Sequence, residues 1–129
     1  MTGVTEALPT WPLTMLKPEL ELRVGAPHEE TLGVLARHLD IAGFKTKDAT
    51  PTGFRAVHFA WGWILVGETS YRTELLVRAE GDAVTVAVGR NARTSKPRRL
   101  AARGLNAALG ELRSRGVGVH WTPWAEQSR

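Results

Sequence analysis

The apolar residues near the start of this chain recur with the period of a helix. The repeat occupies the spacing of three and four residues that places side chains on one helical face: Leu32, Leu35, Leu39 and Ala42. Pro27 suits the first turn of a helix, and Gly43 followed by Phe44 is typical of a helix end. The pattern therefore predicts a helix over about 27–42.

A second helical repeat lies in the last third of the chain. Its apolar positions are Ala101, Leu105, Ala108, Leu109 and Leu112. Thr94 or Ser95 is placed to cap the first turn, so we expect a long helix over about 96–115. Gly104 and Gly110 lie inside this helix, where a glycine permits a neighbouring backbone to approach closely.

Elsewhere the apolar residues alternate with polar ones, which indicates strands with one wet face. The clearest hairpin joins 73–79 to 83–88 across Gly81-Asp82, a pair suited to a tight turn. Two further strands are predicted at 19–24 and 54–60. Shorter candidates fall at 44–48, 64–66 and 117–121.

This order of elements predicts the α+β class. We expect a curved antiparallel sheet of about five or six strands, with the helices at about 27–42 and 96–115 on one face. In element order, residues 19–115 resemble the helix-grip domains, such as the START and polyketide-cyclase-like proteins that hold apolar ligands. They are also similar to the TATA-binding-like domains used as adaptors. A single helix separates the first two strands here, whereas START-like proteins usually have more.

The length of 129 residues suits one domain with a substantial core. We expect an extended Pro/Trp arm over 1–18, a single α+β domain over 19–121 and a short tail over 122–129. The chain has no cysteine, which excludes disulfides and thiolate metal sites. The N-terminus lacks the pattern of a signal peptide, and the longest apolar run, 56–66, is too short to span a bilayer. We therefore expect a cytoplasmic protein without membrane insertion.

Positive charge is concentrated in residues 90–115, which carry eight cations and one anion, whereas residues 1–89 carry eleven anions and eight cations. Hydroxyls, guanidiniums and backbone N–H groups at the start of a helix together suit a phosphate or another anion. The candidate anion-binding or partner-binding residues are Arg93, Ser95, Lys96, Arg98, Arg99 and Arg103. The alternative is that these residues are the solvated face of an amphipathic helix.

Five tryptophans suggest a contact surface, because tryptophan is enriched at interfaces. Trp61 and Trp63 share one face if their strand continues, opposite the small or polar residues of that strand. The candidate interface or pocket residues are His58, Trp61, Trp63, Trp121 and Trp124. A protein partner or a second copy of the chain would cover them. The plainer interpretation is that Trp11, Trp121 and Trp124 pack on their own domain.

The sequence offers little catalytic chemistry. Its four histidines include no pair at i, i+4, and neither a serine-hydrolase motif nor a phosphate-binding glycine loop is present. His58 is either a core residue or a base oriented by Glu68 or Glu74. We expect a non-enzymatic binding or adaptor protein with no cofactor and no metal site. The alternatives are nucleic-acid or other polyanion binding, a helix-grip carrier of a small apolar ligand, and a small hydrolase or cyclase.

Overall fold

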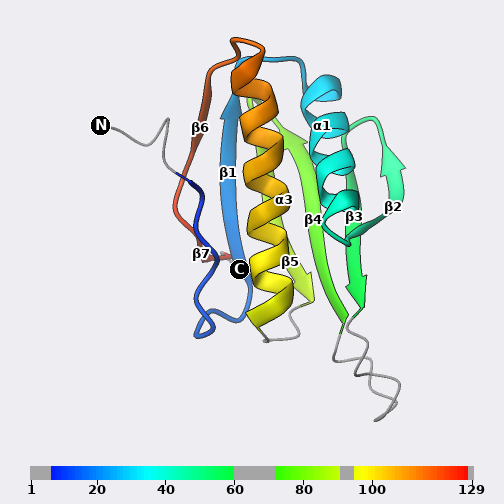
Figure 1. Ribbon diagram of the computed structural model, residues 1–129, viewed down its shortest axis with the longest axis vertical. Coiled ribbons are helices and arrows are strands. Elements are labelled where there is room, and N and C mark those ends of the chain that lie inside the picture. The colour runs from blue at the N-terminus through cyan, green and yellow to red at the C-terminus, as the bar shows by residue number, and fades with distance from the viewer. Residues whose placement is uncertain (1–6, 60–71, 91–94, 128–129) are drawn as a thin grey trace.

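The computed structural model describes residues 7–59, 72–90 and 95–127, and these form two helices and a seven-stranded antiparallel sheet (Figure 1). The predicted α+β class is therefore confirmed. The predicted strand at 64–66 lies outside the described residues. Neither described helix combines the length and apolar character that crossing a membrane requires.

The helices are α1 (His28–Ile41) and α3 (Ser95–Ser114), each within two residues of its predicted ends. The strands are β1 (Pro18–Val24), β2 (Lys45–Thr50), β3 (Gly53–Phe59), β4 (Arg72–Glu80), β5 (Ala83–Arg90), β6 (Val119–Trp121) and β7 (Ala125–Glu126). They lie in the order β2-β3-β4-β5-β1-β6, and β7 also pairs with β1. The first strand thus closes against the fifth, and the sheet continues past it.

Both helices cover the same face of the sheet, as the alternating pattern predicted (Figure 1). In β1, Leu20 and Leu22 are buried, whereas Glu19 and Glu21 belong to the opposite face. The apolar stripe of α3 packs onto the buried side. Its fully buried members are Ala101, Leu105, Ala108, Leu109 and Leu112. Burial of these two apolar surfaces against each other is the main stabilising contribution to the layering.

The two helices approach closely at one glycine. A Cβ at Gly104 would lie 3.0 Å from Leu39 Cδ2 and 3.2 Å from the Ala42 Cβ. A Cβ at Gly110 would meet nothing within 4 Å. The expected close approach is therefore confirmed at Gly104 and is wrong for Gly110, because that part of α3 does not face the backbone of a neighbour.

The two ends of the described chain pack together beside α3 (Figure 1). The Asn106 side chain bonds the backbone of Leu8 twice, accepting from its N–H at 2.7 Å and donating to its carbonyl at 2.8 Å. The stretch expected to be a short tail contains β7, which pairs with Pro18 and Glu19 of β1. The arm and the last strands therefore close one side of the helical layer.

Candidate functional site

Ion pairs occupy the carboxylates over most of the described surface. The paired carboxylates are those of Glu21, Glu30, Asp40, Asp48, Glu74, Glu80, Asp82 and Glu111, each within 4.0 Å of a basic nitrogen. Within the described ranges, none of these pairs includes a residue of α3 that precedes Glu111. The positive charge of the first half of α3 is therefore not neutralised by an ion pair with any described carboxylate.

Three cations line up on the exposed side of this half. Lys96, Arg99 and Arg103 are all exposed, and their spacing of three and four residues places them along one side of the helix. Arg99 donates to the Ser95 hydroxyl at 3.3 Å, which leaves most of its guanidinium hydrogens free for a partner. We call Lys96, Arg99 and Arg103 the basic row.

Arg98 has a different role from its neighbours. Its guanidinium donates to the backbone carbonyl of Trp11, and its side chain is partly buried. This contact ties the N-terminal arm to the start of α3. Arg93, another candidate, lies outside the described residues. The structure therefore brings Ser95, Lys96, Arg99 and Arg103 together at the surface and assigns Arg98 to the arm.

A groove runs beside the basic row, between the end of α1 and the middle of α3. Its volume is about 270 Å³. It is lined by His38, Ile41, Ala42, Leu100, Arg103, Gly104 and Ala107. Ile41 is 74% exposed, the largest exposed fraction among the large apolar residues of the described chain. We call this the α1–α3 groove; it joins an apolar surface to one end of the basic row.

Beyond the groove, Glu111 is held by three basic side chains. It accepts hydrogen bonds from Arg37 and Arg115 and lies 2.7 Å from His38 Nε2. The His38 hydrogen bond, followed by the one from Arg37, lowers the pKa of Glu111 from 4.5 to about 2. Glu111 is therefore ionised and its charge is matched locally, so it does not neutralise the basic row.

His58 is a core residue in this structure. Its ring lies on the helix-covered side of β3, with its centroid 5.3 Å from that of Phe44. Burial, and to a smaller extent the charge of Lys96, lowers the pKa of His58 below 6.5. Among the described residues, its Nδ1 has no hydrogen-bond partner.

The expected orientation of His58 by Glu74 is wrong. His58 pairs with Thr73 in the sheet register, so Glu74 belongs to the opposite face of β4. There the Glu74 carboxylate lies 3.2 Å from Arg55 and 3.1 Å from Arg72. Glu68, the other expected orienter, lies outside the described residues.

The tryptophans divide into two groups. Trp61 and Trp63 lie outside the described residues, so the expected contact face stays a prediction. Trp124 is buried in the core, and Trp121 is partly buried and packs against it. For these two the plainer interpretation holds, because the C-terminal strands pack on their own domain.

The space between α3 and the sheet is occupied by side chains. Leu105 and Leu109 of α3 and Leu75, Val77 and Val86 of the sheet are fully buried as members of one apolar cluster. The helix-grip resemblance implies a ligand chamber in this position. The described side chains of α3 and the sheet pack against each other there instead.

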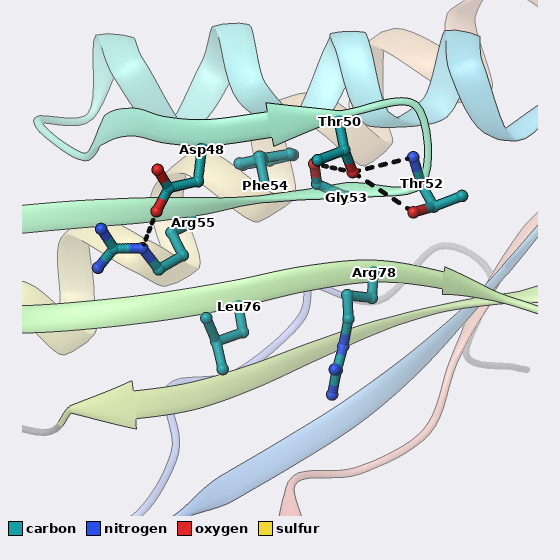
Figure 2. A pocket seen from close by; sticks show the side chains of 8 residues that line it. All are labelled: Asp48, Thr50, Thr52, Gly53, Phe54, Arg55, Leu76 and Arg78. Atoms are coloured by element: carbon teal, nitrogen blue, oxygen red, sulfur yellow. Dashed lines mark hydrogen bonds and ion pairs between the residues drawn. The ribbon is translucent and has the colours of Figure 1, made fainter.

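A further hollow of about 190 Å³ lies on the open face, at the turn between β2 and β3 (Figure 2). Arg55 points toward Asp48, with 2.8 Å between Nε and Oδ2. The Thr50 hydroxyl donates to the Gly53 carbonyl at 3.2 Å and accepts from the Thr52 N–H at 3.3 Å. Asp48 and Thr50 are thus engaged within this turn, whereas Arg78, which also lines the hollow, pairs with Glu80 at 4.0 Å.

Ile41 is a weak sequence signal for the α1–α3 groove. Ile41 lies between Leu39 and Ala42 but off the stripe that begins at Leu32. A single exposed apolar residue is common on protein surfaces, so this signal is weak on its own. The α3 residues that line the groove with Ile41 are distant from it in sequence, so the sequence alone did not predict the groove.

No protein-family model, curated protein or solved structure matches this chain.

Proposed function

We propose that this protein is a non-enzymatic binding protein that holds an acidic partner protein at the start of α3. One observation carries the proposal. The basic row of Lys96, Arg99 and Arg103 is exposed and has no ion pair among the described residues, whereas eight carboxylates elsewhere are paired. A cluster of free cations produces a local positive potential that attracts an acidic surface.

The spacing of the row adds to this argument. Like charges three and four residues apart on a helix repel one another by a few tenths of a kcal/mol. The positive end of the helix dipole lies at the same place and adds to the repulsion. An acidic partner removes this unfavourable term when it binds, so the arrangement favours association.

Two further features support binding over catalysis or transport. His58 packs against Phe44, and no residue in the described ranges forms a hydrogen bond with its Nδ1. A general base is normally oriented by a second polar group, which His58 lacks among the described residues. The filled space under α3 leaves little volume there for a small apolar ligand.

The test is the binding of fluorescein-labelled polyglutamate, measured by anisotropy at low and at physiological salt. We expect affinity to fall with salt, and to fall about tenfold or more in the double variant Arg99→Glu/Arg103→Glu. The matched control is Lys47→Glu/Arg78→Glu, which makes the same charge change at exposed positions of β2 and β4. An equal loss in both variants would show that only net charge matters and would overturn the proposal.

A labelled single-stranded oligonucleotide of similar charge serves as the competing ligand. Tighter binding of the oligonucleotide than of polyglutamate, with the same dependence on the basic row, would assign the surface to nucleic acid instead.

A further inference from the structure

We infer that the α1–α3 groove receives the apolar face of an acidic amphipathic helix from the partner, whose carboxylates meet the basic row. This inference rests on the proposed function and specifies the kind of partner. The two surfaces are continuous, since Arg103 both lines the groove and ends the row.

The size of the groove suits side chains better than a small molecule. Its volume of about 270 Å³ lies below the range of about 300–1,000 Å³ typical of ligand pockets. Leu100 and Ala107 mark its extent along α3, a span of about 10 Å at the rise of an α-helix. That length corresponds to about two helical turns, which present apolar residues at i, i+3, i+4 and i+7.

The apolar lining needs a partner of its own. Ile41 is 74% exposed and lies next to Ala42, Leu100 and Ala107 in the groove. Burying such a side chain against an apolar partner favours binding, a gain that a phosphate backbone does not provide. The groove therefore favours an amphipathic peptide over a nucleic acid.

Charges around the groove set the chemistry of the occupant. Arg103, which has no ion pair among the described residues, lines the groove and is followed toward the start of α3 by Arg99 and Lys96. Toward the end of α3 the Glu111 carboxylate is matched by His38 and the two arginines that bind it. Among the described residues, the free positive charge beside the groove is therefore that of the basic row, which complements the acidic face of an incoming helix.

The inference is tested with two peptides of about 15 residues and equal glutamate content. One carries leucine at i, i+3, i+4 and i+7, and the other carries glutamine there. We expect the leucine peptide to bind wild-type protein about tenfold more tightly. Ile41→Ser should remove most of that difference, and Leu13→Ser, at another exposed apolar residue, should preserve it. Thermal unfolding of both variants checks that they are folded.

Backbone NMR shifts locate the contact. We expect the amides of Ile41 and Ala42, which line the groove on the α1 side, to shift with the leucine peptide and much less with the glutamine peptide. Equal, salt-sensitive binding of the two peptides would overturn the helix inference and leave the proposed function standing. A leucine preference that survives Ile41→Ser would place the apolar contact elsewhere and also overturn it. If the wild-type protein does not bind polyglutamate at all, the proposed function is overturned.

Discussion

The indole rings of Trp11 and Trp124 meet edge to face, with their centroids 5.1 Å apart and their planes inclined at 71°. The Trp124 Nε1 also donates to the Pro9 carbonyl at 2.7 Å. Because Arg98 binds the carbonyl of Trp11, this aromatic pair is connected to the start of α3. The ends of the described chain thus support the helix that carries the basic row.

Removing the Trp124 ring should strongly destabilise the protein. Trp124→Ala leaves a cavity beside the buried Trp11, for which we expect a loss of about 3–5 kcal/mol in the free energy of unfolding. Trp124→Phe keeps most of the packing but loses the bond to Pro9. Its loss of unfolding free energy should be smaller than that of Trp124→Ala but still above about 1 kcal/mol. Urea unfolding measures both. Leu13→Ala, at a residue that is 44% exposed, is the control and should change little. A cost of Trp124→Ala no larger than this control would contradict the aromatic contact.

Alanine at the two glycines of α3 should have opposite effects. Gly110→Ala adds a Cβ that meets nothing within 4 Å, so helix propensity should stabilise the protein by about 0.5–1 kcal/mol. Gly104→Ala adds one that lies 3.2 Å from both the Ala42 Cβ and the His38 carbonyl oxygen. We expect crowding to outweigh propensity and to cost about 1–2 kcal/mol. Thermal and urea unfolding of the two variants measure these effects. Stabilisation by both substitutions would show that the helices can separate freely.

The titration of His58 should depend on Lys96. Burial, and then the charge of Lys96, lowers the pKa of His58, so the folded state holds fewer protons than the unfolded state below pH 6.5. This residue therefore reduces stability as the pH falls from 6.5 toward its folded pKa. Lys96→Gln should raise the midpoint of the His58 ring proton in an NMR titration without restoring 6.5, because burial remains. Arg99→Gln is the matched control, and an equal rise there would contradict the assigned cause.

Acid should weaken the contact between the helices at Glu111. The pKa of Glu111 is lowered from 4.5 to about 2, so the stability it contributes is present above pH 4.5 and is lost as the pH falls toward 2. Glu111→Gln should lower stability at neutral pH and flatten the dependence of unfolding free energy on pH between 4.5 and 2. Glu29→Gln, at an exposed position in the first turn of α1, is the control. An unchanged acid profile in Glu111→Gln would rule out this contribution.

The local elements were predictable because their signals are local. Leu32, Leu35 and Leu39 fixed the buried face of α1, and the alternation around Leu20 and Leu22 fixed that of β1. Helical and strand periods follow from backbone geometry alone, so the class and the layering followed from the pattern. The cluster of arginine and lysine residues in the sequence likewise predicted a basic surface at the start of α3.

Only the tertiary structure decided which charges are free and what lies beside them. Arg98 and Arg99 are adjacent in sequence, yet one binds the arm and the other faces solvent. The groove exists because Gly104 lets α1 approach α3 and places Ile41 beside Leu100. Such contacts join segments far apart in the chain, and their distances depend on how whole elements pack, which no local period specifies.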